Sequence, residues 1–359
     1  MHKFAFIIHP LDVSYVARKF SVARYLPACV VERILLWLPP LKTSYITGVR
    51  SPYGETEGWL ISCPLTSRQM VTLPEKAVLD RIIQAGRLAE KLGAEIVGLG
   101  AMTSVVGDAG ITIARHLNIP VTTGNSYTVA TALEGTRKAA ELMGIDLSRA
   151  DTVVVGATGA IGAVCARILA RECPSLTLVA RNEQKLEHLA RRIVKDTGAD
   201  VRVSRELKEA LRGADVVLTV TSAAEAVIEP EDLKPGAVVC DVARPRDVSR
   251  RVAEERDDVL VIEGGVVEVP GEVDFHFNFG YPPGLAYACM AETMILALEG
   301  RLENFTLGRD LTVEQVDEIG RLARKHGFRL AGLRSFERPL SEEKIAAVRR
   351  RAEEKAARR

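Results

Sequence analysis

The sequence predicts an α/β protein built around a parallel β-sheet, and three observations lead to this prediction. From residue 151 to about residue 270, short runs rich in β-branched residues alternate with segments of helical spacing. Residues 153–170, VVVGATGAIGAVCARILA, join one such run to a glycine-rich turn and a helix of small residues. The 359 residues, of which 47% are hydrophobic and 26% charged, are enough for two domains with sizeable cores.

Net charge and cysteine usage narrow the expected partners and compartment. The formal net charge is +1, so no overall field favours nucleic acid or an anionic membrane, although a local basic patch stays open. The six cysteines form no CxxC pair, and we expect reduced thiols in a soluble, cytoplasmic protein. We also expect no nucleic-acid partner, no metal site, no signal peptide and no transmembrane segment. The cysteines are Cys29, Cys63, Cys165, Cys173, Cys240 and Cys289.

Residues 1–126 are predicted to form an N-terminal α/β substrate domain. Residues 1–12 (MHKFAFIIHPLD) are typical of a first strand, and residues 94–104 (AEIVGLGAMTS) of a buried strand that ends in a polar loop. Between them, residues 76–93 have helical spacing and stop at Gly93.

One apolar segment of this domain, residues 28–40 (ACVVERILLWLPP), has two interpretations. Glu32 and Arg33 interrupt the segment and Pro39 ends it, so it is too short to span a bilayer. We expect a buried amphipathic helix, and a surface that admits an apolar ligand is the alternative.

A second domain is expected over residues 127–274, where a connecting helix leads into repeated strand–helix units. The first of these units carries Gly156, Gly159 and Gly162 in GxxGxxG spacing. Such glycines allow a tight turn, a close approach of backbone to a pyrophosphate and a close packing of helix on sheet. Because a helix N-terminus also favours phosphate, we predict a doubly wound parallel sheet of the Rossmann type that binds a dinucleotide.

The second strand of this domain favours NADP(H) over NAD(H). It ends in LVARNEQKL, where an acidic residue would be typical of an NAD site. Arg181 can stack on the adenine and pair with a 2′-phosphate, and Asn182 adds a neutral donor. We therefore expect NADPH as the cofactor. The residues expected to bind it are Gly156, Thr158, Gly159, Ala160, Ile161, Gly162, Arg181, Asn182 and Thr221.

The alternation of strands and helices stops near Pro270, and residues 275–359 are expected to form C-terminal helices that pack back on the interdomain cleft. Residues 281–300 and 312–327 are typical of two such helices. Residues 341–359 are expected to form a solvated terminal helix.

Two cysteines are candidate nucleophiles. Cys289 follows a Pro-Pro-Gly turn and falls in the first turns of a helix, where the positive end of the helix dipole favours the thiolate. The alternative for Cys289 is a small buried residue in an Ala-rich helix. Cys63 ends a strand before a proline and is the second, loop-facing candidate. The other buried-looking thiols, Cys165, Cys173 and Cys240, are expected to be structural.

Several segments, in order from about Gly98 to Phe328, resemble the cyanobacterial-type long-chain acyl-[acyl-carrier-protein] reductases. They are TTGNSYT, GIDLSRADTVVVGATGAIGAVCARIL, LVARNEQKL, EGGVVE, YACMAETMILALEG and NFTLGRDLTVEQVDEIGRLARKHGF. The resemblance implies an NADPH-dependent reductase that converts an acyl thioester to an aldehyde through a cysteine acyl-enzyme. The cysteine of the family's A-C-x-A-E motif corresponds to Cys289. The implied partners are acyl-ACP or acyl-CoA as substrate, an acyl-carrier protein and an enzyme that consumes the aldehyde.

Four residues beside the nucleophile complete the expected catalytic set. Glu292 lies on the same helix face, where it binds exposed N–H groups, orients a neighbour or is an ordinary surface residue. Asn125 and Ser126 precede the connecting helix, either as donors to a developing oxyanion or as simple N-caps. Tyr127 stands where the family has a histidine, so Tyr127 or His276 would have to transfer protons in its place. The alternative interpretation of His276 is a histidine packed within a strand.

Three alternative functions stay open. An alcohol or amino-acid dehydrogenase of the shikimate dehydrogenase type shares the order of domains and needs no cysteine, but the loop at Asn125 lacks that family's Asp. Glutamyl-tRNA reductase-like chemistry would use Cys63, although the chain shows no basic stripe for tRNA. The third alternative is a binding module that senses NADP(H) without catalysis.

Overall fold

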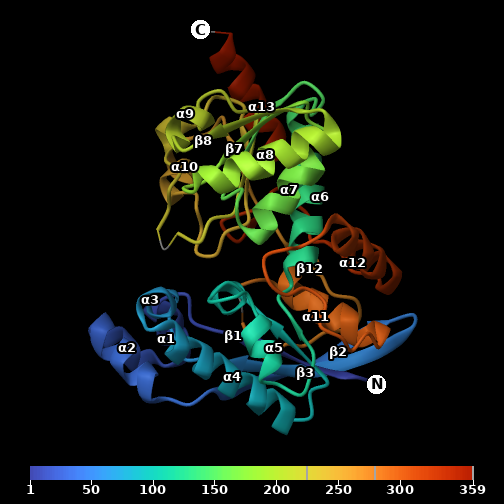
Figure 1. Cartoon of the computed structure of the whole chain (residues 1–359). Coiled ribbons are helices and arrows are strands. Elements are labelled where there is room, and N and C mark those ends of the chain that lie inside the picture. The colour runs from blue at the N-terminus through green and yellow to red at the C-terminus, as the bar shows by residue number, and fades with distance from the viewer. Residues whose placement is uncertain (224, 279, 358–359) are drawn as a thin grey trace. The chain divides into compact units, whose positions relative to one another are not determined.

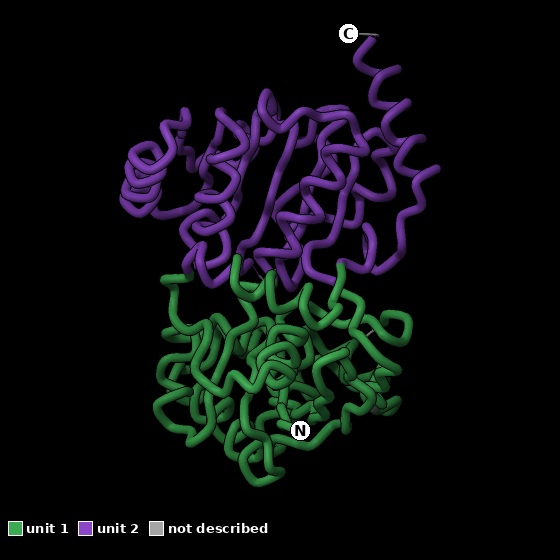
Figure 2. The backbone as a smooth tube through the Cα atoms, turned by 90° about the vertical axis from the view of Figure 1, so that its right-hand side faces the viewer, with its two compact units in different colours: residues 1–127, 267–311, 317–329 green, residues 128–266, 312–316, 330–359 purple. Residues whose placement is uncertain are grey.

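The chain forms two compact units, described by a computed structural model that covers residues 1–223, 225–278 and 280–357. Unit 1 comprises Met1–Tyr127, Val267–Leu311 and Asp317–Arg329, and unit 2 comprises Thr128–Val266, Thr312–Val316 and Leu330–Arg359 (Figure 2). The C-terminal part of the chain therefore contributes to both units.

Unit 1 is built on a five-stranded mixed sheet in the order β2-β3-β1-β4-β5. β1 pairs in parallel with β3 and β4, whereas β2 and β3 form an antiparallel hairpin. The expected first strand is confirmed as β1. The bounds are β1 Lys3–Ile8, β2 Leu41–Ser51, β3 Gly54–Ser62, β4 Ile96–Leu99 and β5 Val121–Thr122.

Two long helices cover the two faces of this sheet (Figure 1). Helix α4 (Glu75–Lys91) packs on β1 and β3, where Val97 and Leu99 of β4 also point into the core. Helix α11 (Ala288–Glu299) contacts β4, β1 and β3. A Cβ on Gly98, which lies between Val97 and Leu99, would come within 2.0 Å of Thr293 Oγ1 of α11. Because successive strand residues point to opposite faces, α11 lies on the face opposite α4.

The Rossmann sheet predicted for unit 2 is confirmed. Six parallel strands lie in the order β11-β10-β9-β6-β7-β8, which places the first three strands in the chain on one side and the next three on the other. The bounds are β6 Asp151–Val155, β7 Ser175–Val179, β8 Asp200–Ser204, β9 Val216–Thr219, β10 Val238–Asp241 and β11 Leu260–Glu263.

The remaining elements connect or flank these sheets. The helices are α1 Val13–Lys19, α2 Ala28–Trp37, α3 Ser67–Thr72, α5 Ile111–Arg115, α6 Asn125–Met143, α7 Ala160–Leu169, α8 Glu183–Thr197, α9 Leu207–Leu211, α10 Arg250–Glu255, α12 Val313–His326 and α13 Glu342–Ala356. The short 3-10 helices are η1 Ser21–Tyr25, η2 Ala101–Ser104 and η3 Pro230–Asp232. The short strands are β12 Val266–Glu268, β13 Leu285–Tyr287, β14 Arg329–Leu330, β15 Arg334–Ser335 and β16 Arg338–Pro339.

Helix α2 differs from its predicted environment. Helix α2, expected to be buried, buries only Val31 and Leu35 and leaves most of its apolar residues exposed. The terminal helix α13 is largely exposed, as expected for a solvated helix, and buries only Ile345 and Ala352. Whether the apolar residues of α2 are covered depends on the tertiary structure, so the local pattern could not reveal it. Within the described residues, no helix combines the length and hydropathy needed to cross a bilayer.

Candidate active site

Cys289 is the second residue of α11 and lies at the edge of the unit 1 core. It is half-buried, whereas every other residue from Ala288 to Ala297 is buried. The N-cap residue Tyr287 makes no side-chain capping hydrogen bond, and Cys289 lies in the first turn, at the positive end of the helix dipole. The predicted position of Cys289 in the first turn of a helix is confirmed.

The loop that follows β5 lies directly against the backbone of Cys289. Gly124 in this loop has a φ of +73°, and a Cβ added there would lie 2.3 Å from the Cα and 2.4 Å from the Cβ of Cys289. Only glycine fits both the backbone angle and the space. The predicted residues Asn125, Ser126 and Tyr127, which begin α6, are thereby brought beside the predicted nucleophile within unit 1.

Glu292 ties α11 to the start of α6. Its side chain is completely buried, and Oε2 accepts hydrogen bonds from Ser126 Oγ at 2.6 Å and from the backbone N of Tyr127 at 2.9 Å. Oε1 accepts from the hydroxyls of Thr122 and of Thr306, the latter at 2.9 Å. Among the interpretations of Glu292, an ordinary surface residue is wrong. The backbone N–H groups in the first turn of a helix have no acceptor within that helix. In α6, Glu292 accepts a hydrogen bond from one of them, the N–H of Tyr127.

The residues at the start of α6 differ in what their polar groups contact. Ser126 is fully buried, and its hydroxyl donates to Glu292. A serine has a single O–H to donate, so in this arrangement that proton does not point toward a substrate. Asn125 and Tyr127 are also buried, with 9% and 4% of their surface exposed.

His276 does not lie in a packed strand, contrary to one of its interpretations. It is exposed, with a φ of +46°. Its Nδ1 lies 2.7 Å from the carbonyl oxygen of Tyr45, and its Nε2 lies 3.2 Å from Oδ2 of Asp274. These contacts hold the ring in a surface loop of unit 1.

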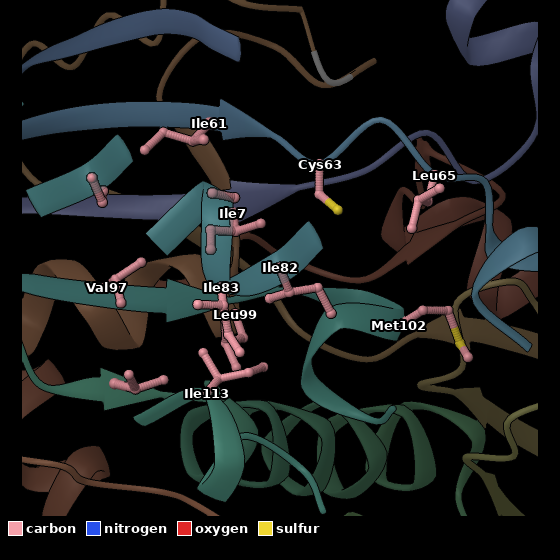
Figure 3. Close-up of a cluster of buried hydrophobic side chains, with 14 of the residues drawn as sticks. Ile7, Ile61, Cys63, Leu65, Ile82, Ile83, Val97, Leu99, Met102 and Ile113 are labelled. Carbon is pink, nitrogen blue, oxygen red and sulfur yellow. The ribbon is translucent and has the colours of Figure 1, made fainter. Parts of the chain in front are cut away.

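Four of the other five cysteines lie in the cores. Cys63 is fully buried among apolar side chains, as Figure 3 shows, so the prediction of a loop-facing thiol is wrong. Burial raises the pKa of Cys63 and of Cys240 to about 12. Burial likewise raises the pKa of Cys165 and Cys173. Cys29 on α2 is exposed.

Brief alkylation of the native protein with iodoacetamide is therefore expected to modify Cys29 and Cys289 and to spare the four buried thiols. Thiolates react, and burial suppresses both access to and formation of the thiolate. Peptide mass spectrometry at about pH 8 measures the pattern, with urea-unfolded protein as the control in which all six cysteines react. Faster modification of Cys63 than of Cys289 in the native protein would contradict the burial described above.

The glycine-rich turn of unit 2 has the geometry of a phosphate cradle. Gly156 follows β6 with a φ of +79°, and a Cβ there would lie 2.5 Å from the carbonyl oxygen of Val220, just beyond β9. A Cβ on Gly162 would lie 2.4 Å from the carbonyl oxygen of Gly156. The turn thus lies where the strand order reverses, and the open N-terminus of α7 follows it. These residues fit a dinucleotide.

The other residues predicted to bind the cofactor differ in their exposure and in their contacts. Thr158, Ala160 and Ile161 are partly exposed along the turn and the start of α7. Arg181 is exposed just past β7, and Asn182 caps α8, its Oδ1 accepting from the backbone N of Lys185 at 3.0 Å.

The predicted cofactor residue Thr221 has a structural partner. Its hydroxyl donates to Asp247, whose Oδ2 also accepts from the backbone N of Thr221 at 2.8 Å. Asp247 is fully buried and also accepts from Thr219 Oγ1 at 2.6 Å. Sequence reasoning missed Asp247, because nothing local marks it as the residue that holds the loop after β9.

The sheet order and the cradle define an NAD(P)-binding domain, and a family match agrees. Residues 137–263 match the family described as Shikimate / quinate 5-dehydrogenase. Unit 2 thus carries an NAD(P)-binding domain of the shikimate dehydrogenase and glutamyl-tRNA reductase type. The chain is 27% identical to the glutamyl-tRNA reductase of Roseiflexus sp. (strain RS-1), over 51% of its own length and 43% of that protein.

Two relatives match a larger part of the chain. The long-chain acyl-[acyl-carrier-protein] reductase of Synechococcus elongatus is 31% identical over 70% of this chain and 76% of its own length. This chain therefore belongs to the same protein family as that reductase. The aminotransferase PigE of Serratia sp. (strain ATCC 39006) is 32% identical over 97% of this chain, which spans only 42% of PigE.

Proposed function

We propose that the protein reduces an acyl thioester, acyl-ACP or acyl-CoA, to an aldehyde with NADPH through an acyl-enzyme on Cys289. The observation that carries the proposal is the placement of the half-buried Cys289 in the first turn of α11, against Gly124 and beside the start of α6. The name of the Synechococcus relative supports the substrate class. NADPH-dependent aldehyde formation from acyl-CoA and acyl-ACP, followed by absorbance and by trapping of the aldehyde, tests it.

The first step is thioester exchange on Cys289. The thiolate attacks the acyl carbonyl carbon, the new C–S bond forms, and the carrier leaves as its thiolate, which takes up a proton. Backbone N–H groups at the start of α11 favour the thiolate before attack and the oxyanion during it. Asn125 is the proposed side-chain donor to that oxyanion.

The second step releases the product. When bound, NADPH supplies the hydride that reduces the acyl group to the aldehyde. Cleavage of the C–S bond then regenerates the Cys289 thiolate for the next turnover. In both steps, Glu292 acts as a positioning residue, because it holds α11 and the start of α6 in one arrangement.

Preference for NADPH is proposed to depend on Arg181. Arg181→Ser is expected to raise the KM for NADPH by at least about tenfold and to change the KM for NADH little, because only NADPH carries the 2′-phosphate. Steady-state kinetics with both cofactors measure this. Arg192→Ser, which removes an exposed arginine further along α8, is the matched control. Equal losses with both cofactors would assign Arg181 a role unrelated to the 2′-phosphate.

A second candidate is an alcohol or amino-acid dehydrogenase, favoured by the family match over residues 137–263. Such an enzyme transfers hydride without a covalent intermediate, so its activity would survive loss of Cys289. The glutamyl-tRNA reductase-like alternative with Cys63 as nucleophile is disfavoured, because Cys63 is fully buried.

An enzyme that consumes the aldehyde is the expected partner. PigE is named an aminotransferase and is more than twice as long as the region it shares with this chain. An aldehyde is the natural amino acceptor of a transaminase, so we place such an enzyme downstream, together with an acyl-carrier protein upstream.

A further inference from the structure

Residues 20–41 of unit 1 form an exposed apolar surface. Nine of the fifteen large exposed hydrophobic side chains found among the described residues lie in this short stretch. Figure 1 shows that α2, which forms its centre, lies at the periphery of the unit beside α1 and α3. Patches of this kind on a water-soluble surface usually mark a site of interaction. The nine residues are Phe20, Val22, Tyr25, Leu26, Val30, Ile34, Leu36, Trp37 and Leu41.

Helix α2 is apolar on its outward face as well as on its inward face. Val31 and Leu35, four positions apart, are its buried residues. Val30, Ile34 and Trp37 follow the same helical spacing on another side and are 39%, 46% and 85% exposed. A helix at a protein–water boundary normally turns polar residues toward the water. The apolar outward face of α2 is therefore suited to contact with another apolar surface. Beside it runs an open groove of about 720 Å³ that continues to Leu73.

The charges around this surface are predominantly basic. Arg24, Arg33 and Lys42 are exposed, and Glu32 is the single acidic residue in the sequence from 20 to 42. Arg68 donates to both oxygens of Glu32, and its guanidinium holds the pKa of that carboxyl below its usual range. The surface therefore pairs an apolar face with an unbalanced positive charge.

Two of the three aromatic side chains of this surface lie at the two ends of α2. Tyr25 precedes α2 and is 88% exposed, and Trp37 ends α2 and is 85% exposed. Tyrosine and tryptophan are enriched at the headgroup level of membranes, where one end of the ring is dry and the other wet. A helix of ten residues can lie in that layer, and it is too short to span it.

We propose that residues 20–41 dock the protein onto an anionic membrane surface, with α2 lying in the plane of the interface. Apolar burial and the attraction of the basic residues to anionic headgroups act together in this arrangement. A second copy of the chain fits less well, because a two-fold pairing would bring together two copies of a surface with the same excess of positive charge. The inference is independent of the reaction proposed for Cys289.

Trp37 provides a direct test, since the chain has only two tryptophans. In the full-length Trp59→Phe protein, emission comes from Trp37 alone. Vesicles of phosphatidylglycerol and phosphatidylcholine are expected to shift this emission to the blue, and brominated lipids to quench it. Co-sedimentation with the same vesicles is expected to exceed that with pure phosphatidylcholine vesicles by at least about tenfold.

Three variants with unchanged circular dichroism and melting temperature complete the test. Ile34→Ser/Trp37→Ser in the native background, assayed by co-sedimentation, is expected to lower vesicle binding at least about tenfold. Arg24→Glu/Arg33→Glu is expected to abolish the preference for anionic lipid. Val105→Ser changes an exposed apolar residue outside the surface and is the matched control.

Several outcomes would overturn the proposal. The proposal is wrong if vesicles leave the Trp37 emission unchanged, or if the protein binds neutral and anionic vesicles equally. It is also wrong if the Ile34→Ser/Trp37→Ser protein binds vesicles as well as the native protein does. A blue shift that needs no lipid and follows protein concentration would assign the surface to a second copy. A blue shift produced by monomeric acyl-CoA in the absence of vesicles would assign it to an acyl chain instead.

Discussion

Replacement of Cys289 by serine is expected to abolish acyl transfer and to lower kcat for aldehyde formation by at least about 10³-fold. A serine hydroxyl at the same place is a far weaker nucleophile at neutral pH, because the helix N-terminus alone does not remove its proton. The substitution exchanges sulfur for oxygen at a half-buried position, so the fold should persist.

The acyl-enzyme can be observed before any reduction takes place. Incubation with acyl-CoA or acyl-ACP in the absence of NADPH is expected to add one acyl group, which peptide mass spectrometry places on Cys289. Cys29→Ser is the matched control, because Cys29 is the exposed thiol on α2. An acyl group on Cys63, or full dehydrogenase activity in the Cys289→Ser protein, would refute the proposed mechanism.

The fold of unit 2 could be predicted because its signals are local. The alternation of strands and helices, the three glycines and the polar residues after β7 lie within a few residues of the structures they specify. The start of α11 is equally local, since a Pro-Pro-Gly turn precedes it and the Ala-rich stretch with Cys289 follows.

The rest of the site depends on contacts between distant segments. Glu292 meets Thr122 and Ser126, which lie 170 and 166 positions away in the sequence, and no periodicity marks this meeting. Thr306 was not expected in the site at all, because a threonine in a loop carries no signal of its own. Cys63 shows the converse: a proline after a strand suggests a loop, but the core of unit 1 covers the thiol.

The same reasoning explains the environment of α2. The apolar residues of α2 predict a buried helix. This prediction holds for Val31 and Leu35, which pack inward. The outward residues find no cover within the described part of the chain, and their exposure could be learned only from the tertiary structure.

Glu292→Ala is expected to lower the free energy of unfolding of unit 1 by about 3–5 kcal/mol, because several buried donors lose their acceptor at once. It leaves the backbone N–H of Tyr127 and the hydroxyls of Thr122, Ser126 and Thr306 without the acceptor that now serves all four. Glu292→Gln keeps the size of the side chain but turns an N–H₂ toward these donors, so we expect a loss of about 1–3 kcal/mol. Urea unfolding measures both losses.

The Gln variant also separates positioning from stability, because it should stay folded. Its rate of Cys289 acylation in native buffer is expected to fall at least about tenfold, with the KM for the acyl thioester nearly unchanged. Glu303→Gln removes an exposed carboxylate that pairs with Arg301 and is the matched control, with an expected change below about 0.5 kcal/mol. If Glu292→Gln acylates as fast as the native protein, Glu292 serves stability alone, and the arrangement of α11 on α6 does not limit the reaction.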